Sequence, residues 1–321
     1  MAVAFIFPGQ GSQTVGMGHA LCAAEPAARR VFEQVDEALG EALSRVIFEG
    51  PEERLRLTEN AQPALMATSL AALRALEARS GRPLAELCAC VAGHSLGEYS
   101  ALAAAGSLTI EDAARLLRLR GRAMQAAVPV GEGAMAAILG LELAAVEEVA
   151  AAASVVGVCD VANDNAPGQV VVSGARAAVE RAVELAKAKG ARRSMLLAVS
   201  APFHCRLLAP AADAVRGALA GIALRPPAVP LISNVTAAPE TDPALLAARL
   251  VEQVTARVRW REILLTMAES GVEATVELGA GRVLSGLTRR TLPGATGSAL
   301  GTPEEIDAYL ATASASRGAS G

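Results

Sequence analysis

The chain has 321 residues, 52% of them hydrophobic and 19% charged, and only five Phe, two Tyr and one Trp are present, so alanine supplies much of the apolar share. No segment reaches the roughly 18 to 20 uninterrupted apolar residues that a membrane-spanning helix needs, and we expect a soluble protein. The net charge of −4 is spread without a basic block, which argues against a nucleic-acid or anionic-membrane surface.

The cysteines form an odd set without a Cys-x-x-Cys pair, which favours reduced thiols in a cytoplasmic protein. They are Cys22, Cys88, Cys90, Cys159 and Cys205. The apolar N-terminus lacks a basic region and runs directly into Pro8-Gly9. We therefore interpret it as a strand followed by a loop, and not as a signal peptide.

The first 128 residues predict two buried strands within a largely helical region. Residues 3–7 are apolar and are followed at once by turn formers, which is typical of a short buried strand. Helical periodicity then dominates to about residue 127, and residues 88–92 interrupt it as a second strand. That strand leads through Gly93-His-Ser-Leu-Gly97 into a helix of small residues over 98–105, and a further helix is expected over 111–127.

The pattern changes between about residues 133 and 200. It predicts strands over 134–139, 155–161, 169–173 and 194–199, and helices over 144–153 and 175–189. The order β-α-β-β-α-β is the ferredoxin-like arrangement. We therefore expect residues 129–200 to form an inserted ferredoxin-like small subdomain.

After residue 200 the alternation of helices and strands resumes. It predicts a helix over 205–219, a strand over 229–233, helices up to 270, a strand over 273–277, a helix from 282 and another over 303–311. Strands separated by helices on both sides of an insertion indicate an α/β fold, with a mostly parallel core formed by residues 1–128 and 201–311. The tail at 312–321 is rich in Ser, Gly and Ala, and we expect it to be disordered.

The segment Gly93-His-Ser-Leu-Gly97 has the Gly-x-Ser-x-Gly pattern of a nucleophile elbow and lies between a predicted strand and a helix, as that turn requires. The two glycines permit the tight turn that exposes Ser95, and the N-terminus of the next helix offers free N–H groups to a developing oxyanion. An ordinary glycine-rich turn or a phosphate-binding loop is the alternative.

A serine nucleophile needs a base, and the chain has three histidines. His94 adjoins Ser95 and should point away from it in support of the turn, whereas His19 lies early in a helical segment. His204 follows a predicted strand and opens a helix, where α/β folds present site residues, so elimination favours it as the base. Cys205 beside it is a weaker candidate nucleophile, because no histidine is spaced to activate it.

The predicted helix over 111–127 places Arg120 on its apolar side. At about 100° per residue, Arg115, Arg118 and Arg122 fall within about 60° of one another, while Arg120 lies about 140° from the first of them. A buried guanidinium is costly unless an anion meets it. That anion is either an internal Asp or Glu or a substrate carboxylate held by the planar guanidinium fork, and the second interpretation suggests acyl transfer from an acid with a second carboxylate.

Several motifs, together with the elbow, resemble malonyl-CoA:acyl carrier protein transacylases, in order, over about residues 1–310. They are Phe7-Pro-Gly-Gln-Gly-Ser-Gln13, Gln62-Pro-Ala64, Gly93-His-Ser-Leu-Gly-Glu-Tyr-Ser-Ala101, Arg120-Gly, Asn165-Ala-Pro-Gly-Gln169, Phe203-His204, and Gln253 with Val258-x-Trp260. The resemblance implies an α/β-hydrolase-like core with a ferredoxin-like small subdomain, in agreement with the periodicity.

The resemblance also implies a mechanism. Ser95 would be acylated by malonyl-CoA, His204 would act as general base and then acid, and Arg120 would bind the malonyl carboxylate. The backbone carbonyl of Gln253 would orient the histidine, which gives a Ser-His dyad without an acidic third member and without a metal or redox cofactor.

Further roles follow from the same resemblance. Backbone N–H groups of Gln10 and Leu96 would form the oxyanion hole, and other residues near the substrate would be His94, Phe203 and the loop residues Asn163 and Asn165. Malonyl-selective members often have His-Ala-Phe-His, whereas this chain has Ala201-Pro-Phe-His204. Since the Phe203 ring leaves little room for a 2-methyl branch, we expect a partial preference for malonyl over methylmalonyl, one methylene being worth about 1 to 3 kcal/mol.

Two other classes of function remain open. A serine hydrolase with a full triad would use Asp160 or Asp164, which lie between Ser95 and His204 in the hydrolase chain order. The second class is a non-catalytic module that docks carrier proteins. Within the resemblance, malonyl transferases of malonate decarboxylase or polyketide assembly are alternatives to fatty-acid synthesis, which a free-standing chain suits best. We expect a cytoplasmic monomer whose partners are malonyl-CoA and acyl carrier protein.

Overall fold

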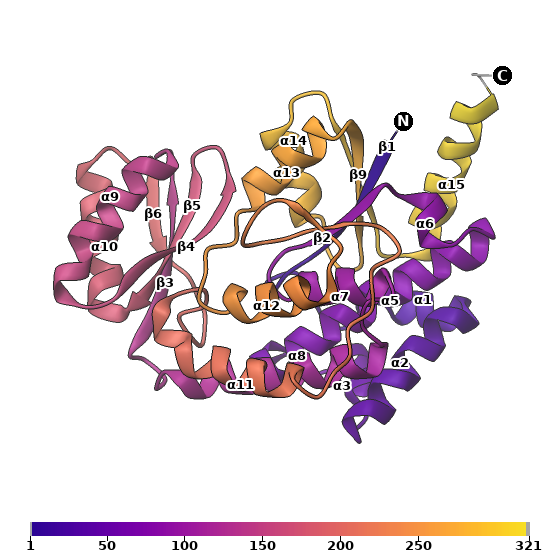
Figure 1. Cartoon of the computed structure of the whole chain (residues 1–321), viewed down its shortest axis with the longest axis horizontal. Helices are drawn as coiled ribbons and strands as arrows, with labels where there is room; N and C mark the ends of the chain where they lie inside the picture. Colours follow the sequence, from indigo (N-terminus) through magenta and orange to yellow (C-terminus); the bar gives the residue numbers. More distant parts are fainter. Residues whose placement is uncertain (1, 319–321) are drawn as a thin grey trace.

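The computed structural model describes residues 2–318, with side chains over 2–312, and builds two separate sheets (Figure 1). In the larger sheet, of order β10-β9-β1-β2-β7-β8, the first five strands are parallel and β8 pairs antiparallel with β7. The strands are β1 (Ala2–Phe7), β2 (Cys90–Gly93), β7 (Leu231–Ile232), β8 (Pro239–Glu240), β9 (Val272–Leu278) and β10 (Thr296–Leu300). The predicted mostly parallel α/β core is confirmed.

Helices cover both faces of this sheet because successive residues of its central strand point to opposite faces. Phe5 and Phe7 join one core cluster, and Ala4 and Ile6 join another. The first cluster includes side chains of α1 (His19–Ala24), α2 (Pro26–Leu39), α3 (Leu43–Glu49), α4 (Glu52–Arg56), α5 (Thr58–Ser80), α6 (Leu84–Leu87), α7 (Gly97–Ala104), α8 (Ile110–Ala127), α11 (Ala209–Leu219), α12 (Pro243–Gln253) and α15 (Pro303–Gly318). The second is closed by α13 (Trp260–Glu269) and α14 (Val283–Thr291).

The smaller sheet is antiparallel, has the order β4-β5-β3-β6 and shares a core cluster with two helices, seen beside it in Figure 1. Its elements are β3 (Gly133–Leu139), α9 (Leu143–Ala153), β4 (Cys159–Ala166), β5 (Gln169–Ala175), α10 (Arg176–Ala188) and β6 (Arg193–Leu196). The predicted β-α-β-β-α-β order is confirmed.

The strand expected over 155–161 is wrong at its beginning. Val155 and Val156 belong to a short 3-10 helix, η1 (Ser154–Val156), and are 73% and 50% exposed. Gly157 then adopts a φ of +147°, so the chain turns before pairing with β5 begins at Cys159. Because β4 continues to Ala166, the asparagines at 163 and 165 lie on a strand and not on a loop.

Other boundaries also differ. A 3-10 helix, η2 (Arg206–Leu208), precedes α11, which begins only at Ala209. β8 is two residues long and β10 lacks the β-branched and aromatic enrichment typical of strands, so neither is predicted. α15 runs to Gly318 and so continues into the tail that begins at residue 312, of which 319–321 lie outside the described residues. No helix within residues 2–318 is long and apolar enough to cross a membrane.

Candidate active site

Ser95 lies at the apex of a strained turn between β2 and α7. Its φ of +54° falls in the left-handed region that non-glycine residues rarely occupy. Packing requires the flanking glycines, because a Cβ on Gly93 would lie 1.8 Å from Gly97 O and a Cβ on Gly97 would lie 2.2 Å from Phe7 O. The turn has the geometry that the Gly-x-Ser-x-Gly pattern predicts.

His204 faces this serine, with its Nε2 atom 2.7 Å from Ser95 Oγ. It also has a left-handed backbone, with a φ of +58°, and lies in a turn before η2. Its Nδ1 atom lies 2.9 Å from Gln253 O and 3.2 Å from Ala256 O. Since carbonyl oxygens only accept hydrogen bonds, Nδ1 carries the ring proton and Nε2 is free to accept the serine proton.

The environment of His204 keeps its imidazole neutral. Burial, followed by the positive charge of Arg120 and by His94, lowers its pKa to about 3. Hydrogen bonds to the two backbone carbonyls act in the opposite direction. The ring is therefore unprotonated throughout the neutral pH range, which is the state that a general base requires.

Arg120 points into the protein from α8, as its helical angle predicts, and is only 1% exposed. Its Nη1 donates to Gln62 Oε1 at 2.8 Å, and its Nη2 donates to Ser95 Oγ at 3.0 Å and to Gln253 Oε1 at 2.8 Å. These acceptors are neutral, Nε has no partner, and within the described chain no Asp or Glu forms an ion pair with this guanidinium. Of the two predicted anions, an internal carboxylate acts only at a distance, because Glu98 is linked to the guanidinium through Gln253, and a substrate carboxylate remains the predicted direct partner.

Arg118 is also buried, although its helical angle groups it with Arg115 and Arg122 and not with the apolar stripe. It is 7% exposed and donates hydrogen bonds to Asn60 Oδ1 and Glu41 Oε1. The reason is that α8 packs against α5 and also against α2, so its buried arc is wider than its apolar stripe. Arg115 and Arg122 lie on the exposed side, as expected.

Two buried residues to which the sequence analysis assigned no role, Glu98 within the elbow motif and Asn234 outside the motifs, support the elbow together with Gln253. Asn234 Oδ1 accepts the Ser95 N–H at 2.8 Å, and its Nδ2 donates to Gly93 O at 2.7 Å. Gln253 Nε2 donates to Ser95 O at 2.8 Å and also to Glu98 Oε2. Asn234 N donates to Glu98 Oε1 at 3.0 Å. A charge inside an otherwise small and apolar helix, and an asparagine directly after a core strand, are the signals that point to these residues.

The backbone N–H groups of Gln10 and Leu96 form no hydrogen bond with the part of the chain that the structure describes. Gln10 follows the end of β1, and Leu96 directly follows the nucleophile at the start of α7. Free N–H groups at these positions are what an oxyanion hole requires, although their role remains a prediction.

His94 contacts the small sheet and not Ser95. Its Nε2 atom lies 2.8 Å from Asn165 Oδ1 on β4, and its ring centroid lies 5.6 Å from that of Trp260. Its position agrees with the expected support of the turn, and it joins the elbow to β4. Phe203 is buried directly before the candidate base.

The two aspartates of the alternative triad are engaged elsewhere. Asp160 forms an ion pair with Arg206, and Asp164 pairs with Arg261 at 2.9 Å. Neither forms a hydrogen bond with His204, whose Nδ1 is already bound to backbone carbonyls. The geometry therefore favours a dyad, and neither aspartate is placed to complete a triad with His204.

The other weaker candidates also fail. Cys205 Sγ donates to Pro202 O at 3.1 Å, and burial raises the pKa of its thiol to about 11, so it is not a thiolate. The ring of His19 packs against that of Phe48, with centroids 5.1 Å apart. Within residues 2–318, no group of three or more His, Cys, Asp or Glu side chains is arranged to hold a metal.

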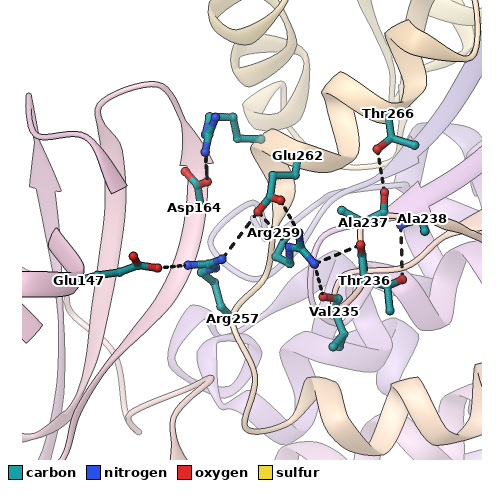
Figure 2. Close-up of polar contacts among 11 residues, drawn as sticks. Glu147, Asp164, Val235, Thr236, Ala237, Ala238, Arg257, Arg259, Glu262 and Thr266 are labelled. Atoms are coloured by element: carbon teal, nitrogen blue, oxygen red, sulfur yellow. Dashed lines mark hydrogen bonds and ion pairs between the residues drawn. The ribbon is translucent and has the colours of Figure 1, made fainter. Parts of the chain in front are cut away.

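Ion pairs anchor the segment that supplies the carbonyl acceptors of the candidate base. Figure 2 shows Arg257 between Glu147 of α9, at 2.6 Å, and Glu262 of α13, at 3.7 Å. In the backbone, Asp164 N donates to Val258 O at 2.9 Å. The segment between α12 and α13 is therefore held against the small sheet.

Comparisons with known proteins agree with this geometry. Residues 4–304 match the acyl transferase domain family. The chain is 45% identical to the malonyl CoA-acyl carrier protein transacylase of Bacillus subtilis (strain 168) over 311 residues, which are 97% of this chain and 96% of the relative. The crystal structure of an acyl-carrier-protein-S-malonyltransferase from Bartonella henselae has a TM-score of 0.94 and 53% identity, and the match covers 97% and 99% of the two chains. A malonyl-transacylase solved in complex with a type II PKS acyl-carrier protein has a TM-score of 0.93 and 39% identity, with 97% and 100% covered.

Proposed function

Because this chain belongs to the acyl transferase family and, within it, to the malonyl CoA-acyl carrier protein transacylases, we propose that it transfers the malonyl group from malonyl-CoA to the phosphopantetheine thiol of acyl carrier protein. The supporting observation is the juxtaposition of three side chains. Ser95 Oγ lies 2.7 Å from the neutral His204 and 3.0 Å from Arg120, a buried guanidinium without a carboxylate partner in the described chain.

In the first half of the reaction, Ser95 Oγ attacks the thioester carbonyl of malonyl-CoA while His204 Nε2 takes the serine proton. The new C–O bond places negative charge on the carbonyl oxygen, which the N–H groups of Gln10 and Leu96 stabilise. The intermediate then collapses, the C–S bond breaks, and His204 returns its proton to the sulfur of CoA. The product is a malonyl ester of Ser95.

In the second half, the carrier thiol gives its proton to His204 and its sulfur attacks the malonyl ester. The C–O bond to Ser95 then breaks, and the serine oxygen recovers the proton. The two carbonyls on Nδ1 hold the ring in the required tautomer, as a triad aspartate does elsewhere, so a dyad suffices.

Arg120 gives the site its selectivity for an acyl group with a free carboxylate. A carboxylate bound there offsets the positive charge that lowers the pKa of His204, so the base becomes stronger when a malonyl group is present. The Phe203 ring beside the base limits branching at the 2-position.

We further propose a cytoplasmic enzyme of fatty-acid synthesis that acts as a monomer. The relative solved with a type II PKS acyl-carrier protein makes a polyketide carrier the second candidate partner. The five cysteines are all free thiols, which fits a reducing compartment.

Mass spectrometry of the intact protein tests the proposal. After incubation with malonyl-CoA we expect one malonyl adduct, absent from Ser95→Ala, that carrier protein discharges faster than water does. An adduct that water removes as fast as carrier protein does would instead indicate a hydrolase. Undiminished labelling of Ser95→Ala would exclude this serine as the nucleophile.

A further inference from the structure

Glu98 is a buried carboxylate at the site to which the mechanism above assigns no role. It lies in the first turn of α7 with 0% exposure, and no Lys, Arg or His of the described chain forms an ion pair with it. Burial of an ionised carboxylate without a partner cation is unfavourable. Helix capping does not explain it either, because its oxygens accept hydrogen bonds from other segments.

Both carboxylate oxygens face hydrogen-bond donors. Oε1 accepts the backbone N–H of Asn234 at 3.0 Å, and Oε2 accepts from Gln253 Nε2. The first donor is a backbone group and cannot become an acceptor. The second is fixed by its other contacts, since Gln253 Oε1 accepts from Arg120 at 2.8 Å and Nε2 donates to Ser95 O at 2.8 Å. Both oxygens therefore act as acceptors here, and the ionised carboxylate suits this pair of donors best, because a proton on either oxygen would add a donor where an acceptor is needed.

We propose that ionised Glu98 is a positioning residue for acyl transfer: it holds the backbone of Asn234, whose side chain binds the Ser95 N–H, and the side-chain amide of Gln253, which binds Ser95 O and Arg120. The inference rests on the proposed function, because it assigns Glu98 a part in that reaction. Asn234 Oδ1 accepts the Ser95 N–H, and the Gln253 carbonyl accepts from His204. One carboxylate thus holds partners of the nucleophile, of the base and of the guanidinium.

Protonation of Glu98 would break this arrangement at a pH where His204 is still neutral. Burial raises the pKa of Glu98 to about 7, although hydrogen bonds from Asn234, Gln253 and Ser233 and the charge of Arg120 lower it. Besides Arg120 on α8, the titratable group that acts on it is Tyr99, on α7 itself. As the pH falls through about 7, a carboxylate oxygen becomes an O–H donor facing another donor, and the acylation rate should fall.

The substitution Glu98→Gln tests the proposal by placing an NH2 group where an oxygen stood. We expect the introduced side chain to keep its oxygen toward the Asn234 N–H, so that its NH2 group meets the Gln253 amide and turns it. The turned amide then presents NH2 to Arg120. We expect kcat/KM for acylation by malonyl-CoA to fall about 10- to 100-fold at pH 8, the range for loss of a hydrogen bond to a charged group.

The pH profile of this variant separates a positioning role from a structural one. In the parent protein we expect kcat/KM to fall as the pH decreases through about 7. We expect no such fall in Glu98→Gln. The matched control is Glu277→Gln, because Glu277 on β9 is equally buried but accepts from the N–H groups that begin α14. It should keep the parent profile. An unchanged rate and profile in Glu98→Gln would overturn the proposal.

The parent protein supplies a measurement that does not depend on the variant folding. We expect its rate of malonyl-adduct formation to fall through about pH 7 while the NMR signals of the His204 ring stay those of the neutral form. A fall that follows protonation of His204 would overturn the inference about Glu98 and leave the proposed function intact. Failure of the parent to form any malonyl adduct would overturn the proposed function itself.

Discussion

Arg120 Nη2 donates a hydrogen bond of 3.0 Å directly to Ser95 Oγ, the candidate nucleophile. The same oxygen lies 2.7 Å from His204 Nε2. A substrate carboxylate that binds this guanidinium therefore lies next to the reacting oxygen. It competes with Ser95 Oγ for the hydrogen bond that Arg120 Nη2 donates. Substrate selection and the reactivity of the serine consequently depend on one side chain.

We predict that Arg120→Ala loses most of its preference for malonyl-CoA over acetyl-CoA. A bidentate, charge-assisted pair contributes about 1.5 to 3 kcal/mol, so kcat/KM for malonyl-CoA should fall by roughly 10- to 150-fold more than that for acetyl-CoA. Arg120→Lys should recover only part of the preference, because lysine keeps the charge without the planar fork. Stopped-flow acylation with both thioesters measures the ratio, and an unchanged ratio would place the carboxylate elsewhere.

The same substitution should raise the pKa of His204. The charge of Arg120 is the second cause, after burial, of the low pKa near 3, so its removal shifts the pKa upward while burial keeps it below the ordinary value of 6.5. NMR titration of the His204 ring protons in Arg120→Ala provides the measurement. Arg118→Ala is the control, since it removes another buried arginine of α8 that does not act on His204, and a similar shift in both variants would contradict the prediction.

The helical angle predicts the burial of only one of the two buried arginines of α8. Arg120 lies on the apolar stripe, whereas Arg118 is buried because neighbouring helices pack on two sides, and periodicity within one helix carries no information about a second neighbour. Glu98 was missed because an acidic residue in the first turn of a helix is ordinary at an exposed N-terminus. Its burial depends on long-range packing that covers α7 on all sides.

The strand-turn-helix around Ser95 follows from local sequence, because the glycines and the buried strand lie within a few residues of one another. The hydrogen-bond partners of His204, in contrast, do not follow from local sequence. Its Nδ1 atom is held by the backbone carbonyls of Gln253 and Ala256, 49 and 52 residues away in sequence, and a backbone carbonyl has no residue-type signature. Only the family resemblance indicated Gln253.

We predict that Asp160→Asn and Asp164→Asn reduce kcat by no more than about threefold. Both carboxylates pair with arginines, and neither bonds the base, so the chemistry should survive their neutralisation. Loss of a true triad aspartate costs about 10⁴-fold in kcat. Steady-state transfer by the folded variants distinguishes the two cases, and a loss near that size in either variant would restore the triad.

Removal of Arg261 should destabilise the protein more than removal of the aspartate that it pairs with. The Asp164 side chain is 1% exposed, and burial already raises its pKa, so Arg261→Ala would leave a buried, unpaired carboxylate. We expect a loss of about 3 to 5 kcal/mol in the free energy of unfolding, and a smaller loss for Asp164→Asn, which removes the charge. Arg45→Ala breaks an exposed pair and should lose less than about 1 kcal/mol. Urea denaturation of the three variants measures these losses. Equal losses in the free energy of unfolding would contradict the prediction.

Ionisation of Glu98 should favour activity but lower the stability of the folded protein. The sign of the effect on the free energy of unfolding can be measured. Its pKa is about 7 in the folded protein against an ordinary value of 4.5, so the folded state binds this proton more tightly than the unfolded state does. The resulting stability is fully present below about pH 4.5 and is lost as the pH rises through about 7, a change of about 3 kcal/mol. Glu98→Gln cannot ionise, so its free energy of unfolding relative to the parent should increase by about that amount between pH 4.5 and pH 8. Urea denaturation at both pH values tests this, and a difference that does not depend on pH would show that the carboxyl ionises with equal ease in both states.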